Sequence, residues 1–279
     1  MTQDHPADPA VSAQVCYRHP DRHTLLRCSR CERPICASCS IDAQVGQRCP
    51  ECVRAEGTQK VIPTGPRRAN TAPPGTLAFI IAAAVLFLLG MFNENLDQLF
   101  LEMFAQANWL VAQGEWWRIF TPVLLHASLM HIMFNMWALW VLGPQIERGV
   151  GTLPFVGLYL ASAGMGGVAF YYLGDPGAIA VGASGAIFGL FGIWFNWALR
   201  RRNTMHGRAL LRQIGFLLLI NAAIPFMIPG IAWEAHLGGL VTGFLIGEVW
   251  SRIKGPNATA MRAMVAFAFA ALAATLVLI

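Results

Sequence analysis

Seven cysteines and one histidine near the start of the chain fall into four pairs, and two residues separate the members of each pair. Two ligands at that spacing can reach one tetrahedral metal ion from a single tight turn. Eight such ligands satisfy two four-coordinate ions, and zinc prefers thiolate and imidazole donors. The sequence therefore predicts two structural zinc sites, with the ligands Cys16, His19, Cys28, Cys31, Cys36, Cys39, Cys49 and Cys52.

A disulfide framework is the alternative for these cysteines. Their number is odd, one pair contains a histidine, and the polar residues 1–13 lack the apolar core of a secretory signal. Metal sites are therefore favoured over disulfides. So small a segment has little apolar core of its own, and we expect its folding to depend on the metal.

The four pairs can be shared between two ions in more than one way. In one arrangement the first pair shares an ion with the third, and the second pair shares an ion with the fourth. A segment built in that way resembles the cross-braced zinc fingers of the B-box and RING type. The sequence leaves the pairing open.

A second group of polar residues lies in the apolar remainder of the chain, where a polar side chain is costly to bury. Ser184 lies in a Gly-Ala-Ser-Gly segment, and His236 lies in a later apolar stretch. His131 and Asn135 are four residues apart and share one face of a helix. Acyl transfer by a serine needs a base and donors for the oxyanion. These residues could supply all of those roles.

Each of these residues also has a purely structural interpretation. A serine in a membrane helix commonly bonds to a carbonyl one turn back, and a histidine commonly bonds to a neighbouring helix. The combination favours chemistry, together with Phe188, which lies one turn after Ser184 and could support an imidazole ring. Asp175 and Glu234 are predicted in loops, so a Ser-His dyad is favoured over a Ser-His-Asp triad.

The composition indicates what must position these residues. Hydrophobic residues make up 56% of the 279 residues and charged residues only 13%, whereas a soluble domain has about a quarter charged. An all-α polytopic membrane protein is therefore predicted. Its apolar stretches are each close to the ~20 residues that cross a bilayer. They lie at 76–92, 120–142, 153–173, 182–199, 209–228, 233–250 and 262–279. The acidic, amphipathic loop 93–119 is expected partly in the membrane interface.

Arginine and lysine set the expected orientation, because positive residues favour the cytoplasmic side. The residues Lys60, Arg67, Arg68, Arg200, Arg201, Arg202, Arg208, Arg212, Arg252, Lys254 and Arg262 lie in the linker and in alternate turns. The N terminus is therefore expected in the cytosol and the C terminus outside. The reducing cytosol agrees with free thiolates in the finger.

Glycines explain how the helices could approach one another closely. Gly185 and Gly189 are four residues apart beside Ser184, and Gly239, Gly243 and Gly247 follow His236 on the same helical face. Small residues at this spacing let membrane helices pack backbone to backbone. Such packing would be needed with or without chemistry.

The chain is thus divided into five parts by sequence. The expected parts are a disordered tail at 1–15, a zinc finger at 16–54, a proline-rich linker at 55–75, a membrane core at 76–251, and an inner loop with a seventh helix at 252–279.

Four separated motifs in the membrane core resemble the rhomboid family of intramembrane serine proteases, over roughly residues 75–250 and in the family's order. They match its Trp-Arg first loop, its His/His/Asn second helix with a Gly-x3-Glu near the end, its nucleophile motif and its histidine motif. The matching segments are Glu115-Trp116-Trp117-Arg118, His126 to His131 and Asn135, Gly143-x3-Glu147, Gly182-Ala183-Ser184-Gly185 and Ala235-His236-Leu237-Gly238-Gly239.

The resemblance implies a role for each matching residue. Ser184 would be the nucleophile and His236 the general base and then general acid. The Ser184 N–H, His131 and Asn135 would line the oxyanion hole. The remaining matches would be structural, with His126, Arg118 and Glu147 in supporting positions.

The resemblance also implies the fold and the substrates. The fold would be a six-helix core plus one C-terminal helix, and no cofactor would be needed for catalysis. Substrates would be single-span membrane proteins, cut near the outer end of the span. The loop from Pro225 to Trp233 would be a mobile cap over the site. We expect an integral protein of a bacterial cytoplasmic membrane.

Two other function classes remain at this stage. A catalytically silent relative would bind membrane helices without cutting them, but the intact Ser184/His236 pair counts against it. A transporter could use His126, His131 and His236 as a proton path, but internal repeats and mid-membrane charges are not evident. Three roles are open for the finger: binding a cytosolic protein, aiding assembly, or stabilising the N terminus. Nucleic acid is disfavoured as its partner because its arginines form no basic stripe.

Overall fold

The computed structural model describes residues 14–43, 45–55, 73–227 and 230–279. The chain forms two compact units, residues 1–67 and 68–279. The predicted tail and linker fall mostly outside the described residues. Both predictions extend too far at their edges, because Gln14–Val15 is a strand of the finger and Pro74 begins the first helix of the membrane unit.

The N-terminal unit is built from short hairpins and one small helix. Strands β1 (Gln14–Val15) and β2 (His23–Thr24) pair antiparallel, and so do β3 (Ile41–Asp42) and β4 (Gln47–Arg48). A 3-10 turn η1 (Ala37–Cys39) and helix α1 (Pro50–Ala55) complete the unit. The buried cluster consists of Ile35 and six of the seven cysteines, with Cys31 and Tyr17 packed against it. Almost no apolar side chain other than cysteine is therefore available to hold this unit together.

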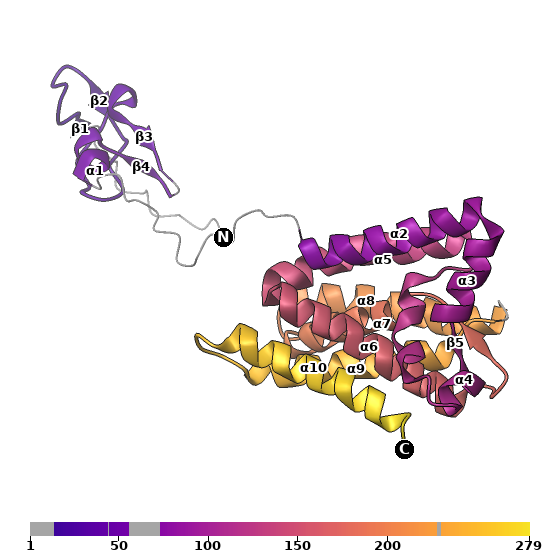
Figure 1. The fold of residues 1–279 in the computed structure, drawn as a ribbon. Helices are drawn as coiled ribbons and strands as arrows, with labels where there is room; N and C mark the ends of the chain where they lie inside the picture. Colours follow the sequence, from indigo (N-terminus) through magenta and orange to yellow (C-terminus); the bar gives the residue numbers. More distant parts are fainter. Residues whose placement is uncertain (1–13, 44, 56–72, 228–229) are drawn as a thin grey trace, which may run out of the picture. The chain divides into compact units, whose positions relative to one another are not determined.

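The C-terminal unit is a bundle of long helices, as the apolar composition predicts (Figure 1). These helices are α2 (Pro74–Phe92), α5 (Leu129–Val150), α6 (Thr152–Leu173), α7 (Ser184–Arg200), α8 (Met205–Met227), α9 (Trp233–Arg252) and α10 (Ala258–Leu276). Helix α6 is central to the bundle: it packs on α7, α9 and α10. The core between these helices includes Leu139, Leu158, Leu190, Ile246 and Trp250.

Four of these helices are long and apolar enough to cross a membrane: α2, α6, α8 and α10. Helices α5, α7 and α9 do not meet the same test within the described residues. They are the helices that carry the candidate site residues and the charged residues Glu147, Arg200 and Glu248. Helix α7 has 17 residues and is too short to count as a span by that test. In α5 and α9, polar residues that face the bundle interior weaken the hydropathy signal.

The second predicted span, 120–142, is wrong in its boundaries, because the helix covers Leu129–Val150. The 3-10 turn η2 (Trp116–Ile119) lies just before the predicted span. A second 3-10 turn, η3 (Thr121–Leu124), occupies its start and contains Pro122. The helix begins where the Ser128 hydroxyl accepts a hydrogen bond from the His131 N–H at 3.2 Å. Its polar last turns are missed by hydropathy because Glu147 is buried among hydrogen-bond donors.

Glu147 joins the end of α5 to the start of α2. Its carboxylate accepts hydrogen bonds at 2.8 Å from the N–H groups of Gly75 and Thr76, and at 2.7 Å from the Thr76 hydroxyl. The Thr152 hydroxyl donates a fourth bond at 2.9 Å. The first N–H groups of a helix have no intrahelical acceptor and favour negative charge. A carboxylate that is 3% exposed is therefore fully satisfied, and it caps α2 from a distant helix.

The first loop is largely helical and is tied to the segment that precedes α7. It contains the amphipathic helix α3 (Glu94–Phe104), strand β5 (Gln106–Ala107) and helix α4 (Asn108–Ala112). Strand β5 pairs antiparallel with β6 (Ile179–Ala180). Because β6 lies four residues before Ser184, this pairing anchors the approach to α7.

Candidate active site and metal centres

Ser184 and His236 lie at the starts of two helices that pack against each other. Ser184 is the first residue of α7, and His236 lies in the first turn of α9. A Cβ placed on Gly185 would lie 3.3 Å from the Ala235 carbonyl oxygen and 3.7 Å from the Ala235 Cβ. The neighbour of the serine and the neighbour of the histidine are therefore in contact. This brings the two helix starts to one place.

The close approach of α7 and α9 depends on glycines along their shared face. A methyl group on Gly239 would overlap the carbonyl oxygen of Gly185, and one on Gly243 would overlap the carbonyl oxygen of Gly189. Larger residues would push the helices apart along their whole contact. The glycine spacing is thus needed to bring the first turn of α9 beside the first turn of α7.

The imidazole of His236 stacks on the ring of Phe188. The two ring centroids are 4.2 Å apart and the planes differ by 6°. Phe188 lies one turn after Ser184 on α7, so the stack places the histidine ring beside the helix that begins with the serine. Both rings are restrained, because Phe188 is only 8% exposed.

His131 lies against the loop that leads into α7. A Cβ on Gly182 would lie 2.7 Å from both Cε1 and Nε2 of the His131 ring, and the φ of Gly182 is +125°. A side chain is excluded there on both counts. The Gly182 N–H also donates to the Pro122 carbonyl at 2.9 Å. The Gly-Ala-Ser-Gly backbone thus passes directly over His131.

Asn135 is 7% exposed and lies one turn after His131 on α5. Its side-chain amide donates one hydrogen bond to the His131 carbonyl at 2.9 Å. An asparagine amide has two N–H donors, so the second is left for another acceptor. His131 and Asn135 therefore present ring and amide donors from one helix face.

His126 precedes α5 rather than lying within a span. Its ring meets that of His131 edge to face, with centroids 5.1 Å apart. Both of its ring nitrogens are buried, and no described residue bonds to either. A polar ring that lacks protein partners at such a position is consistent with a bridging water.

Arg118 is 5% exposed and holds the first loop together. Its guanidinium donates to the Glu115 carboxylate at 2.6 Å, to the Ala105 carbonyl at 2.8 Å and to the Glu102 carbonyl at 2.6 Å. The planar fork of an arginine can satisfy several acceptors at once, and a lysine could not reproduce this arrangement. Arg118 thus fastens the end of α3 to η2.

Neither carboxylate considered for a triad, Asp175 or Glu234, makes a hydrogen bond to His236 in the described residues. No Asp or Glu among the described residues bonds to the imidazole. Glu234 was predicted in a loop, and that prediction is wrong, because it is the second residue of α9. The Asp175 carboxylate accepts from the Gly177 N–H at 2.7 Å, within its own turn.

Two residues that the sequence did not single out hold the strand before α7. The Gln106 amide donates to the Gly167 carbonyl at 2.8 Å, and the Asn108 amide donates to the carbonyls of Phe170 and Asp175 at 3.2 and 2.9 Å. Both residues are 2% exposed. Their only sequence signal is a pair of amides in an otherwise apolar segment.

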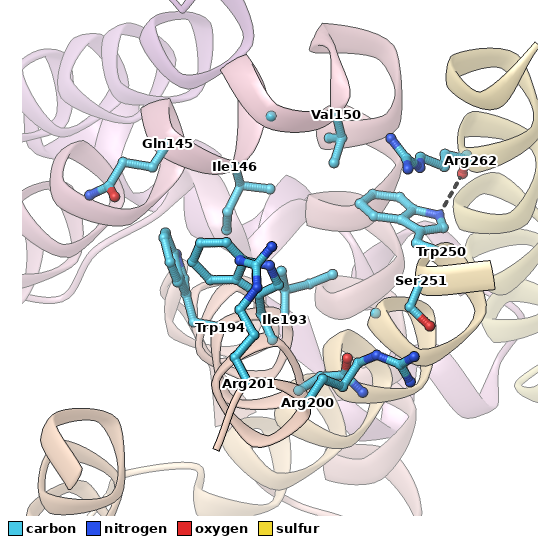
Figure 2. A pocket seen from close by; sticks show the side chains of 14 residues that line it. Gln145, Ile146, Val150, Ile193, Trp194, Arg200, Arg201, Trp250, Ser251 and Arg262 are labelled. Carbon is cyan, nitrogen blue, oxygen red and sulfur yellow. Dashed lines mark hydrogen bonds between the residues drawn. The ribbon is translucent and has the colours of Figure 1, made fainter. Parts of the chain in front are cut away.

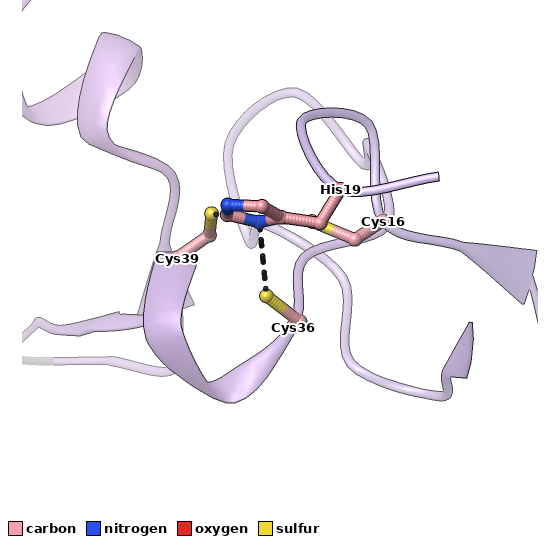
Figure 3. A group of neighbouring side chains, drawn as sticks. All are labelled: Cys16, His19, Cys36 and Cys39. Carbon is pink, nitrogen blue, oxygen red and sulfur yellow. Dashed lines mark hydrogen bonds between the residues drawn. The ribbon is translucent and has the colours of Figure 1, made fainter. Parts of the chain in front are cut away.

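The first ligand set in the finger joins the first Cys/His pair to the third pair. The ligand atoms of Cys16, His19, Cys36 and Cys39 all lie within 4.8 Å of one another. Figure 3 shows the His19 ring between the sulfurs, with its Nδ1 3.4 Å from the Cys36 sulfur and 3.3 Å from the Cys39 sulfur. Nδ1 is therefore the ligating nitrogen in this arrangement.

The second set consists of Cys28, Cys31, Cys49 and Cys52. The sulfurs of Cys31 and Cys49 are 3.8 Å apart, which is close to the edge of a tetrahedron built on metal–sulfur bonds of about 2.3 Å. The pairs are thus interleaved, first with third and second with fourth, which is the cross-braced arrangement. All seven cysteines are free, so the disulfide alternative is excluded in this structure.

The thiol pKa values in both ligand sets are shifted in both directions. Burial raises the pKa of Cys39 to about 11, and the neighbouring Cys49 sulfur raises the pKa of Cys52 to about 12. Burial raises the pKa of the Cys16 thiol, but backbone hydrogen bonds from Arg18 and Cys36 outweigh it and bring that pKa to about 6. Burial acts in the same direction on Cys28, and backbone bonds from Cys49 and Cys31 bring its pKa to about 6. Because a metal binds the deprotonated sulfur, the lowered pKa values in each set fit a divalent ion.

The known proteins that are similar to this chain align with its membrane unit. The Rhomboid domain family matches residues 113–253. The chain is 38% identical over 179 residues to Rhomboid protease GluP of Bacillus subtilis, covering 63% of this chain and 34% of that protein. It is 37% identical over 171 residues to the Bacillus subtilis protein YdcA, covering 61% of this chain and 85% of that protein.

A third relative comes from a eukaryote. The chain is 39% identical over 146 residues to Rhomboid-like protease 1 of Toxoplasma gondii, covering 51% of this chain and 50% of that protein. This chain therefore spans about a third of GluP and half of the Toxoplasma protein. The finger lies outside the matched residues 113–253.

Proposed function

This chain belongs to the rhomboid family, and on that premise we propose that it is an intramembrane serine protease with Ser184 and His236 as its catalytic dyad. The observation that carries the proposal is the stack of His236 on Phe188, one turn from Ser184, at the meeting point of α7 and α9. The catalytic base is thereby held over the helix that starts with the nucleophile.

The reaction needs only these two side chains and water. His236 accepts the proton of the Ser184 hydroxyl as its oxygen attacks the scissile carbonyl carbon. The tetrahedral intermediate collapses, the C–N bond breaks, and the imidazolium gives its proton to the leaving amine. A water molecule, deprotonated by the same imidazole, then attacks the acyl-serine. The bond between the acyl carbon and the Ser184 oxygen breaks, the imidazolium returns its proton to that oxygen, and the new carboxyl terminus is released.

Three donors would stabilise the oxyanion. The first intrahelical bond of α7 runs from the Ile187 N–H to the Ala183 carbonyl, so the Ser184 N–H lies outside the helix ladder. His131 and the second N–H of Asn135 would supply the others. Donors fixed before the reaction stabilise developing charge without reorganisation. His126, Arg118, Glu147 and Phe188 would act by positioning these groups.

The substrates would be single-span membrane proteins, cut near the outer end of their transmembrane helix. Under the proposed orientation the N terminus is cytosolic and the C terminus outside, because arginines gather in the linker and in the turns after α7 and α9. The segment between α8 and α9 would form a mobile cap. The bounds predicted for it are too wide, because Pro225 lies inside α8 and Trp233 is the first residue of α9. This proposed cap includes residues 228–229, which lie outside the described residues.

The finger would hold two Zn²⁺ ions with a structural role and would face the cytosol. Zinc fits because each set offers four donors, cysteine sulfurs with at most one imidazole, which is the donor number and type of structural zinc sites. A cytosolic protein is the proposed partner of this unit. Metal analysis of the purified chain tests the assignment, with two zinc ions expected for each chain.

Cleavage of single-span reporters in proteoliposomes tests the catalytic proposal. Ser184→Ala and His236→Ala should each lower turnover by at least about 1000-fold. Ser162→Ala is the matched control, because Ser162 is a fully buried serine on α6 whose hydroxyl bonds to no described residue. It should stay active.

Labelling with a fluorophosphonate probe separates the two remaining readings. If the probe labels the wild type but not the Ser184→Ala variant, Ser184 is supported as the nucleophile, even where no reporter is cut. Equal cleavage by wild type and Ser184→Ala would remove the serine mechanism. A folded wild type that neither cleaves nor labels would favour the alternative of a catalytically silent binder of membrane helices.

A further inference from the structure

The end of the bundle far from Ser184 holds a pocket of about 580 Å³. Helix α7 runs from Ser184 to Arg200, which is about 25 Å at 1.5 Å per residue. The pocket lies at the later end of α7, among the last turns of α5 and α9 and the first turns of α10 (Figure 2). The proposed proteolytic mechanism does not use it.

Three arginines line this pocket, and none of its lining residues is acidic. Arg200 and Arg201 come from the end of α7 and Arg262 from α10. The Arg201 guanidinium lies 4.0 Å from the centroid of the Trp197 ring, which holds it in place. Arg200 pairs with Glu248 at 2.9 Å, so its charge is partly offset. The remaining charge in the pocket is positive.

Two buried donors in the same pocket lack an acceptor. The Trp194 indole N–H and the Arg262 Nε–H are both buried, and no described residue accepts a hydrogen bond from either. By contrast, the Trp250 indole donates to the Arg262 carbonyl at 3.0 Å, and Arg262 Nη2 donates to the Ile253 carbonyl at 3.2 Å. These two bonds join the end of α9 to the start of α10. The Trp194 and Arg262 Nε N–H groups still lack an acceptor among the described residues. Buried donors normally find a partner, and positive surroundings select an anion.

The rest of the lining is apolar. Ile146, Val150 and Ile193 lie beside the tryptophans, as Figure 2 shows for the labelled side chains. Tryptophan is common where a membrane protein meets the head-group region. A soluble anion would gain nothing from the aliphatic wall, whereas an amphiphile with a phosphate and a glycerol backbone would contact both parts.

We infer that this pocket binds the phosphate group of an anionic phospholipid, with Arg262, Arg201 and Trp194 as its donors. Basic pockets between membrane helices are a recurring way to hold such head groups. The site is separate from the proposed dyad, and the inference does not depend on proteolysis. The lipid would join the ends of α5, α7, α9 and α10.

Lipid titration of the full chain in neutral detergent, followed by native mass spectrometry, tests this inference. The probes are phosphatidylglycerol, phosphatidylcholine and inorganic phosphate. Arg262→Gln should weaken phosphatidylglycerol binding about tenfold or more, as expected for the loss of a charge-assisted bond. Trp194→Phe should weaken it severalfold and leaves the Arg262 contact with Ile253 intact. Arg208→Gln, on α8 and outside the pocket, is the matched control and should bind within about twofold of wild type.

The outcomes show whether the pocket is the binding site and whether the bound phosphate belongs to a lipid or to a soluble anion. Tight binding of phosphatidylglycerol with weak binding of phosphatidylcholine and inorganic phosphate supports the lipid. Equal binding of inorganic phosphate would overturn the lipid and assign the pocket to a soluble anion. Equal retention of phosphatidylglycerol by wild type, Arg262→Gln and Trp194→Phe would overturn the pocket itself. Circular dichroism of each variant confirms that it is folded.

Discussion

The two units of this chain are held together by different means. The finger buries little besides cysteine and Ile35, and its ligands gather into two sets. The membrane unit buries small and apolar residues along several helix contacts, and glycines allow α7 and α9 to touch. In the finger, the two Cys/His groups make up most of the buried core, so we expect its stability to depend on the metal they could hold. In the membrane unit, stability is distributed over packing, with a few polar bonds at helix ends.

This difference has a general consequence for how each unit responds to change. A unit that depends on one kind of bond should fail as a whole when that bond is removed. A unit that depends on distributed packing should respond by degrees, according to how far each contact can relax.

Metal removal should give the largest difference between the responses of the two units. Chelation of the full chain should abolish hydrogen-exchange protection across residues 14–55, because the finger has almost no other core, and should leave the helices protected. His19→Ser should behave similarly, because it removes a ligand of the first set. His23→Ser is the control, since this exposed histidine belongs to neither set. A finger that stays protected after chelation would contradict the metal-dependent core.

Loss of the Glu147 carboxylate should be the largest single-residue effect in the membrane unit. Glu147→Ala leaves the N–H groups of Gly75 and Thr76 buried without an acceptor, and should cost about 3 kcal/mol or more. Unfolding in a detergent titration measures the cost. Glu147→Gln keeps one acceptor and should cost less, and Glu94→Ala, at an exposed position on α3, should cost less than about 1 kcal/mol.

Adding a side chain at the contact between α7 and α9 should have an intermediate effect on stability. Gly243→Ala places a methyl group on the Gly189 carbonyl oxygen, and should destabilise the unit by about 1–3 kcal/mol. It should also lower reporter cleavage, because the first turn of α9 carries His236. Gly215→Ala on α8 meets nothing within 4 Å and should be neutral or slightly stabilising. The same cost for both alanines would show that close approach is not the reason for Gly243.

An intrahelical polar bond beside that contact should matter least. The Thr242 hydroxyl donates to the Gly238 carbonyl at 2.7 Å within α9. Thr242→Val keeps the shape and removes the bond, and should cost about 0.6 kcal/mol in the same titration. A cost larger than that of Gly243→Ala would mean that polar bonds outweigh packing in this unit.

Much of the candidate site could be predicted from sequence because its signals are local. Pair spacing singled out the eight Cys and His residues that the structure gathers into two groups able to hold a metal ion, and short motifs pointed to Ser184, His236, His131 and Asn135, which lie on helices. The pairing of the ligands remained open, because spacing within a pair says nothing about which turns meet. The second span was misplaced, because hydropathy cannot detect that a charged residue such as Glu147 is satisfied inside the bundle.

The sequence by itself determined the class of the protein: an apolar chain of membrane helices behind a Cys/His finger, with rhomboid motifs in order. These follow from composition and from residues a few positions apart, where geometry is imposed by the backbone. The tertiary structure alone decided which ligand pairs come together and that Glu147 caps α2, and it confirmed the contact of Phe188 with an imidazole ring. It also decided the arginine-lined pocket at the opposite end. Each of those joins residues distant in the chain, and only the packing of whole helices and hairpins brings them together.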